Sequence, residues 1–256
     1  WRNQDGEIRK IGIKNICYHF IVFLKEHIMY KKDFQKHLNI VEDLYRLDKK
    51  NKIDESNLFS LYLRENLPAG LISGGSISHA IGVINNLQKC TDKKTVVVTL
   101  EQLPNLDKEV IVHNLDNEIK FRNVKDYMSI AVNDLFYETI EKAMEDKKCQ
   151  FIYQRCSINA YAGVRYALEH DIPFVLEYNS SEVWTSKQWG GSKLKFIDFS
   201  EKVEKLLLEK ADLITCVSKP LKQQLIEQGI KENKIIVTPN GVDVDKYNPA
   251  ISGKEI

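Results

Sequence analysis

The residues best suited to chemistry lie where predicted strands end and polar segments begin. One such segment, GGSISH at residues 74–79, leads from a predicted strand into a helical pattern. Glycines let the backbone approach a ligand, and free N–H groups at a helix start attract anions such as phosphate. Gly74, Gly75 and Ser76 are therefore candidate phosphate-binding residues. A plain strand-to-helix turn that needs glycine for its geometry explains the glycine pair equally well.

Two basic residues extend this candidate site. His79 falls in the first turn of the predicted helix, where the positive end of the dipole disfavours an imidazolium, so we expect a neutral ring that can bind a sugar hydroxyl. A functionless histidine on the helix surface is the simpler interpretation. Arg155 follows a short predicted strand and could bind an anionic or hydroxyl-rich ligand. A structural ion pair with Glu177 or Glu182 is the alternative.

A polar segment with sequence EYNSSEVW, residues 177–184, follows the next predicted strand. Acids, amides, hydroxyls and an aromatic ring in one short stretch suit a carbohydrate. Asn179, Ser180 and Glu182 are thus candidate sugar-binding residues. The alternative is an ordinary polar loop around a tryptophan, Trp184, that is anchored in the core.

The last strong signal is the turn PNGVD at residues 239–243, which ends a strand-like run. The sequence stops 13 residues after Asp243. We interpret Asn240, Gly241 and Asp243 as a hinge, and we expect the chain to be one half of a two-lobed protein.

The elements that must position these residues alternate between strand and helix from residue 58 onward. This alternation predicts an α/β fold with a doubly wound, parallel, Rossmann-like sheet, whose ligands bind at the carboxyl ends of the strands. Residues 1–56 are expected to form a helical extension of two helices and loops, residues 57–243 the lobe itself, and residues 244–256 the start of a linker. The predicted strands are residues 58–63, 95–100, 110–115, 150–154, 173–176, 213–217 and 235–238. The predicted helices include residues 134–147, 193–210, one capped by Ser157 that runs to His170, and one from Ser218 to Gly229.

Composition excludes several classes of protein. Charged residues make up 29% of the chain and the net charge is +1, without the concentrated basic stripe of a nucleic-acid-binding protein. The five cysteines are odd in number and lack C-x-x-C spacing, so we expect neither a disulfide framework nor a zinc site, and a reducing cytoplasm fits. Lysines of the helix at 193–210 could touch the inner face of a membrane, although a solvated helix face is the simpler interpretation.

In this order, the motifs resemble glycosyltransferase family 4, which has the two-lobed GT-B fold. The resemblance covers roughly residues 58–249, and it is to the amino-terminal lobe of that fold. The matching segments are YLR at 62–64, GGS at 74–76 with His79, IYQR at 152–155, IPFVLEYN at 172–179 with SEVW at 181–184, ADLI at 211–214 with VS at 217–218, and PNGVD at 239–243.

The resemblance implies an enzyme that moves a hexosyl group from a nucleotide sugar to a carbohydrate or lipid-linked acceptor. It implies retention of the anomeric configuration and no metal or other cofactor. Gly74 and Gly75 would approach the donor diphosphate, while this lobe mainly holds the acceptor. The leaving-group clamp would come from the missing carboxyl-terminal lobe, so we expect this chain to be catalytically silent alone. Family members often carry a histidine where this sequence has Arg155 and Cys156, and that role is not transferred.

Two other interpretations remain open. The chain could be a non-catalytic Rossmann-like module that binds a sugar or a partner. A nicotinamide-dependent enzyme is disfavoured, because the G-x-G-x-x-G fingerprint of dinucleotide-binding folds is missing.

Overall fold

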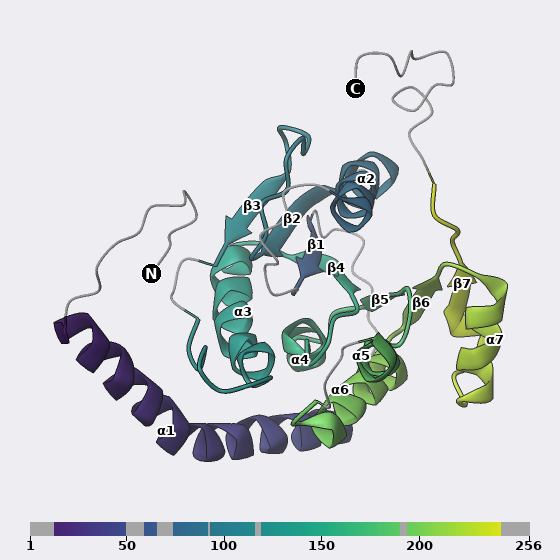
Figure 1. The fold of residues 1–256 in the computed structure, drawn as a ribbon. Helices are drawn as coiled ribbons and strands as arrows, with labels where there is room; N and C mark the ends of the chain where they lie inside the picture. Colours follow the sequence, from purple (N-terminus) through teal and green to yellow (C-terminus); the bar gives the residue numbers. More distant parts are fainter. Residues whose placement is uncertain are drawn as a thin grey trace, which may run out of the picture.

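The computed structural model describes residues 13–49, 59–65, 74–91, 93–115, 119–189 and 194–241. Within these ranges, seven strands form one sheet in the order β3-β2-β1-β4-β5-β6-β7, and every pairing is parallel (Figure 1). The predicted parallel α/β sheet is therefore confirmed. The strands are β1 (Phe59–Arg64), β2 (Lys94–Thr99), β3 (Ile111–Asn114), β4 (Cys149–Arg155), β5 (Phe174–Tyr178), β6 (Leu213–Cys216) and β7 (Ile235–Val237).

Helices cover both faces of the sheet, with α2 on one side and α3 and α4 on the other (Figure 1). A short 3₁₀ helix, Glu232–Lys234, precedes β7. The α-helices that follow the first strand are α2 (Gly75–Thr91), α3 (Met128–Met144), α4 (Ala162–Glu169), α5 (Glu182–Trp189), α6 (Ile197–Lys210) and α7 (Lys219–Glu227).

The strands are apolar in continuous runs because both of their faces are buried. Side chains of β1 alternate between the faces, so Leu61 and Leu63 join the large core under α3, α4 and α6, whereas Tyr62 packs with Val97 under α2. All four side chains are fully buried. This packing fixes the register that brings the carboxyl ends of neighbouring strands to one edge.

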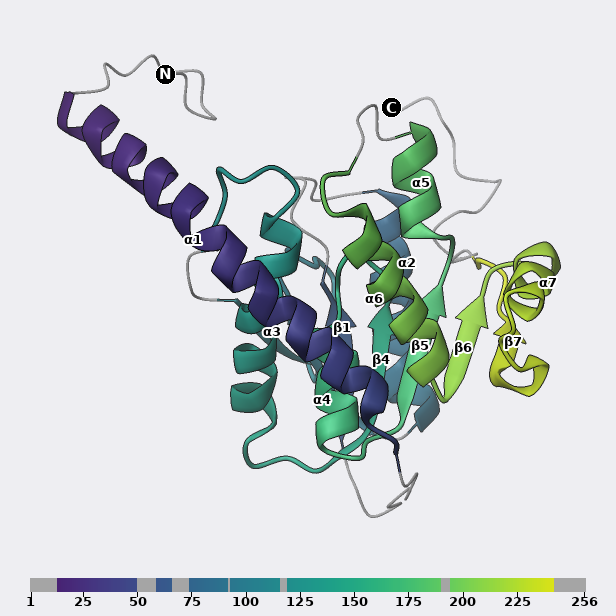
Figure 2. The ribbon, with the colours of Figure 1, turned by 90° about the horizontal axis from the view of Figure 1, so that it is seen from below.

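The amino-terminal region is one long helix, α1 (Ile13–Arg46), and not the two helices that we predicted. Its carboxyl-terminal half packs against the large core at the predicted helical spacing, through Phe34, Leu38, Val41 and Leu44. Figure 2 shows this half crossing beside α3 and α6. The residues share one face of a continuous helix, and no break signal interrupts them, which explains the single element. None of the described helices is long and apolar enough to cross a membrane.

Two predicted helices start elsewhere than expected. The helix that we placed after Ser157 begins at Ala162, because the buried amide of Asn133 accepts the N–H groups of Tyr161 and Ala162 at 2.7 and 3.0 Å and fixes the first turn there. The helix predicted from residue 134 begins at Met128.

The helix α7 follows its predicted signals more closely. The Ser218 hydroxyl accepts the N–H of Leu221 as an N-cap, and Pro220 lies in the first turn. Gly229 has φ +90° just beyond the last turn. Local chemistry therefore predicts this helix, whereas the start of α4 depends on a residue 28 positions away.

We expect Leu44→Ala to destabilise the fold by about 2–4 kcal/mol, because it leaves a cavity between α1 and the core. Urea unfolding would measure this change. The matched control is Leu47→Ala, since Leu47 is 39% exposed and its truncation should cost less than about 0.5 kcal/mol. Equal effects at the two positions would show that α1 does not dock through Leu44.

Candidate functional site

A buried carboxylate, Glu177 near the end of β5, gathers three of the predicted residues. His79 Nε2 donates to Glu177 Oε1 at 3.0 Å, and Asn179 Nδ2 donates to the same oxygen at 2.7 Å. Arg155, paired in register with Glu177 on the neighbouring strand, places its Nη1 at 3.3 Å from that oxygen. Residues that are up to 100 positions apart therefore meet at the carboxyl edge of the sheet.

The charge at this cluster is fixed by its neighbours. Burial opposes ionisation of Glu177, but the hydrogen bond from His79 and the charge of Arg155 outweigh it and hold the pKa of Glu177 below its ordinary value. Glu177 Oε2 and Arg155 Nη1 are buried and have no hydrogen bond of ordinary geometry among the described residues. The ion pair joins Arg155 Nη1 to the other carboxylate oxygen, Oε1. Both atoms therefore have unused hydrogen-bonding capacity at positions that are closed to solvent.

The structure bears on the simpler interpretations of Arg155, as half of a structural ion pair, and of His79, as a histidine on the helix surface. The structural ion pair between Arg155 and Glu177 is present. His79 is not an isolated histidine on the helix surface, because it is bound to Glu177 and only 26% of its side chain is exposed.

The glycine pair begins α2 as expected, but its two members differ. The carbonyl of Gly74 accepts the N–H groups of Ile77 and Ser78 at 3.0 and 2.9 Å, and its φ of +137° requires glycine. Gly75 has no such conformation, and a Cβ built there meets no described atom within 4 Å. Turn geometry therefore explains Gly74, whereas nothing in the described packing demands a glycine at position 75.

An arginine that sequence reasoning did not assign to the site anchors this helix start. Arg64, the last residue of β1, is 1% exposed and forms an ion pair with Glu101. Its Nη2 donates to the hydroxyl of Ser76 at 2.9 Å. The rule that sites lie at strand ends could have identified Arg64, because it follows the apolar run of β1 directly.

Glu65, the next residue, is also buried and was also missed. Its Oε1 accepts the N–H of Gly163 at the start of α4 at 3.2 Å. Burial raises the pKa of Glu65 to about 7, although the hydrogen bonds from Gly163 and Ala162 act in the opposite direction. A carboxyl that titrates near neutral pH therefore lies at the same edge of the sheet.

The polar segment after β5 is not a loop around a buried tryptophan, as one interpretation held. β5 continues to Tyr178, α5 begins at Glu182, and Trp184 is 54% exposed. The carboxylate of Glu204 on α6 accepts the hydroxyl of Ser181 at 2.6 Å and orders the start of α5.

The remaining candidates lie beside this helix start. Ser180 is half-buried between β5 and α5. Burial and the charge of Glu204 raise the pKa of Glu182, whereas Arg155 lowers it. Both residues thus lie at the edge that holds Glu177.

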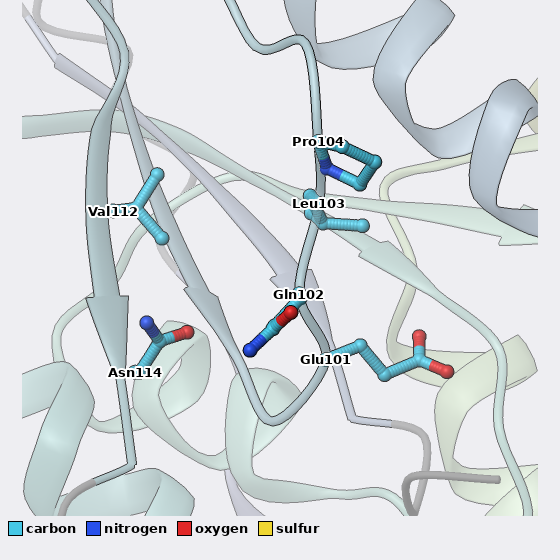
Figure 3. Close-up of a pocket in the computed structure, with 6 residues that line it drawn as sticks. All are labelled: Glu101, Gln102, Leu103, Pro104, Val112 and Asn114. Atoms are coloured by element: carbon cyan, nitrogen blue, oxygen red, sulfur yellow. The ribbon is translucent and has the colours of Figure 1, made fainter. Parts of the chain in front are cut away.

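A cavity of about 370 Å³ lies between β3 and the loop that follows β2, toward the β3 end of the sheet and away from β5 (Figure 3). Figure 3 shows the amide side chains of Gln102 and Asn114 facing each other across it. The other lining residues are Glu101, Leu103, Pro104 and Val112. Sequence reasoning identified none of them, since a space between a strand and a connecting loop leaves no local pattern.

The predicted hinge follows β7. Asn240 and Gly241 are exposed, and the N–H of the preceding Thr238 still bonds to the carbonyl of Cys216 at 2.8 Å. Asp243 lies outside the described residues.

Comparisons with known proteins agree with the resemblance. The family model described as Glycosyltransferase Family 4 matches residues 73–246, which is more than half of the chain. No curated protein matches the sequence significantly.

Solved structures share the fold at low sequence identity. Sucrose-phosphate synthase from Thermosynechococcus elongatus superposes with a TM-score of 0.54 and 14% identity, over 73% of this chain and 49% of that one. A glycosyltransferase from Rickettsia africae has a TM-score of 0.47 and 19% identity, over 78% of this chain and 47% of that one. UDP-GlcNAc 2-epimerase from Neisseria meningitidis, bound to UDP-GlcNAc, has a TM-score of 0.49 and 14% identity, over 71% of this chain and 45% of that one. The chain thus has the Rossmann-like fold of one GT-B lobe and spans about half the length of these proteins.

The charge of Glu177 should stabilise the fold at neutral pH. Glu177→Gln should cost about 3 kcal/mol there, because Arg155 loses its buried partner. A carboxyl with a lowered pKa contributes stability above its unfolded pKa and loses it as pH falls through its folded pKa. Chemical unfolding should therefore show a difference at pH 7 that shrinks as the pH falls below about 4.5, the ordinary pKa of the group. A difference independent of pH would contradict the charged pair.

Glu65 should have the opposite pH dependence. Its raised pKa means that stability is greatest below about pH 4.5 and falls as pH rises toward 7. Glu65→Gln, which cannot ionise, should gain up to about 3 kcal/mol over the native chain between pH 5 and pH 8. Thermal melts across this range measure the gain, with Glu138→Gln as an exposed control. A constant offset would show that Glu65 is charged throughout.

Proposed function

Because the chain belongs to glycosyltransferase family 4, we propose that it is the acceptor-binding lobe of a retaining glycosyltransferase. The enzyme would move a hexosyl group from a nucleotide sugar to a carbohydrate or lipid-linked acceptor. The single observation that carries this proposal is the meeting of α2's glycine start with the Glu177 cluster at one edge of the sheet. His79 makes this link, since it belongs to α2 and binds Glu177.

The start of α2 supplies the elements of a diphosphate contact. Helix N-termini favour anions through their N–H groups and their dipole. Gly75 offers open space in which the backbone can approach a phosphate oxygen. Arg64 donates a hydrogen bond to the hydroxyl of Ser76, which fixes the position of the first turn of α2. We propose that Gly74, Gly75 and Ser76 face the donor diphosphate.

The Glu177 cluster supplies the elements of a sugar contact. Glu177 Oε2 and Arg155 Nη1, which have no hydrogen-bond partner within the described part of the chain, are an acceptor and a donor of the kind that sugar hydroxyls pair with. His79 and Asn179 orient the carboxylate. We propose that these residues, with Arg155, Ser180 and Glu182, bind the sugar or the acceptor.

Transfer would break the bond between the sugar's anomeric carbon and the diphosphate oxygen, and join that carbon to an acceptor oxygen, whose hydroxyl proton would leave with the departing diphosphate. The departing diphosphate needs cationic stabilisation. Arg64 and Arg155 are already paired with Glu101 and Glu177. We therefore propose that a second lobe, joined through the hinge at Asn240, Gly241 and Asp243, provides the cationic clamp, and that neither a metal nor another cofactor is needed.

Gly75→Asp tests the diphosphate contact. In the enzyme that carries both lobes, the carboxylate should repel the diphosphate and raise the donor KM at least about tenfold, or roughly 1.4 kcal/mol. An acid at a helix start is neutral or stabilising for the fold, so the effect should not come from unfolding. Steady-state kinetics with nucleotide sugars measure it.

The matched control is Gly75→Asn, which has the same size without the charge and should have a much smaller effect. Native KM and kcat in Gly75→Asp would remove the diphosphate contact. If the two-lobed protein bound sugars but never transferred them, the non-catalytic module would be the correct interpretation.

A further inference from the structure

The amino-terminal half of α1 carries a concentration of exposed apolar side chains. Of the twelve large hydrophobic side chains that are exposed in the described part of the chain, eight lie between residues 16 and 29. Ile28 is 77% exposed and Ile21 63%. Monomeric proteins rarely expose such contiguous apolar surface without a partner. The eight residues are Ile16, Tyr18, Phe20, Ile21, Phe23, Leu24, Ile28 and Met29.

The lysines of the same segment lie among these apolar side chains on the helix surface. A row at four-residue spacing, Ile16, Phe20, Leu24 and Ile28, runs along one side. Three lysines follow a second line, because their spacings of eleven and seven residues are close to three and two helical turns. These are Lys14, Lys25 and Lys32. Ile21 lies on one side of this line, and Tyr18 and Met29 lie on the other, so the cations are interspersed in the apolar surface and their stems can extend along it.

The exposed charge of this segment is uniformly positive. Between residues 14 and 32 the one acidic residue is Glu26, and its carboxylate accepts the backbone N–H groups of Arg122 and Asn123 at 3.1 and 3.0 Å. The cations, including Lys31, face solvent without an acidic complement on the segment itself.

We propose that the amino-terminal half of α1, residues 14–32, lies in the interface of an anionic lipid bilayer. Exposed apolar and aromatic side chains would enter the acyl boundary, and the interspersed lysines would extend to anionic headgroups. A second copy of the chain would bring the same lysines against one another, which disfavours a dimer through this surface. The helix is not apolar enough to cross the bilayer.

The amino-terminal half of α1 is a different surface from the one suggested by the sequence, which was the lysines of the helix at 193–210. Two lysines of α6 are engaged with α1 and the residues after it, Lys202 with Glu42 and Lys210 with the carbonyls of Tyr45 and Leu47. The third, Lys205, is exposed and pairs with Glu209 of the same helix. Figure 2 shows the amino-terminal half of α1 reaching past the carboxyl ends of the strands. Binding through α1 would therefore hold the edge that bears Glu177 near the membrane.

Flotation of the 1–256 chain with vesicles tests this inference. The chain should float with phosphatidylcholine vesicles that contain phosphatidylglycerol and much less with phosphatidylcholine alone. Combined Phe20→Gln, Leu24→Gln and Ile28→Gln should lower the partition coefficient at least about tenfold. Combined Lys14→Gln, Lys25→Gln and Lys32→Gln should lower it about fivefold per lysine at low salt.

The control is Ile236→Gln, which removes an exposed apolar side chain from β7 and should float like the native chain. Circular dichroism establishes that each variant is folded, and Ile28→Gln alone replaces the triple variant if that one is not. Flotation that is absent, or equal with and without anionic lipid, would overturn the inference. Self-association that the apolar variant abolishes would assign the surface to a second copy instead.

Discussion

The site depends on one buried carboxylate that must stay charged. Glu177 lies in the central part of a seven-stranded sheet, where burial alone would favour its neutral form. Hydrogen bonds from His79 and Asn179 and the charge of Arg155 reverse that preference. Each of these groups comes from a different element, so the carboxylate also links α2, β4 and the end of β5. The contacts that keep Glu177 charged therefore also hold these elements together at this edge.

A parallel sheet is what makes this arrangement possible. Since all seven strands point the same way, Arg64, Arg155 and Glu177 end at one edge although they lie far apart in the chain. The apolar runs that specify the strands are local patterns, and for this reason the sheet could be predicted from the sequence. The same patterns predicted the edge on which polar residues would gather.

Which polar residues contact one another could not be predicted from local patterns. Glu177 was considered as a partner of Arg155 and as part of the polar segment at 177–184, but its contact with His79 was not predicted, because it joins segments 98 positions apart. The start of α4 was misplaced for a similar reason, since Asn133 on α3 fixes it. By contrast, the cap of α7 by Ser218 is contained within four residues and was correctly predicted. Side-chain contacts between elements depend on register and packing, which no single segment encodes.

The balance of charge at the edge bears on how a diphosphate could bind there. Glu101 and Glu177 are buried acids, and each is paired with an arginine, Arg64 and Arg155. Neither guanidinium therefore contributes a full positive charge to an approaching anion. The N–H groups at the start of α2 supply only the partial charge of a helix dipole, typically about half an elementary charge. A nucleoside diphosphate that touches Gly75 would thus need most of its counter-charge from outside the described residues, as the proposal of a second lobe requires.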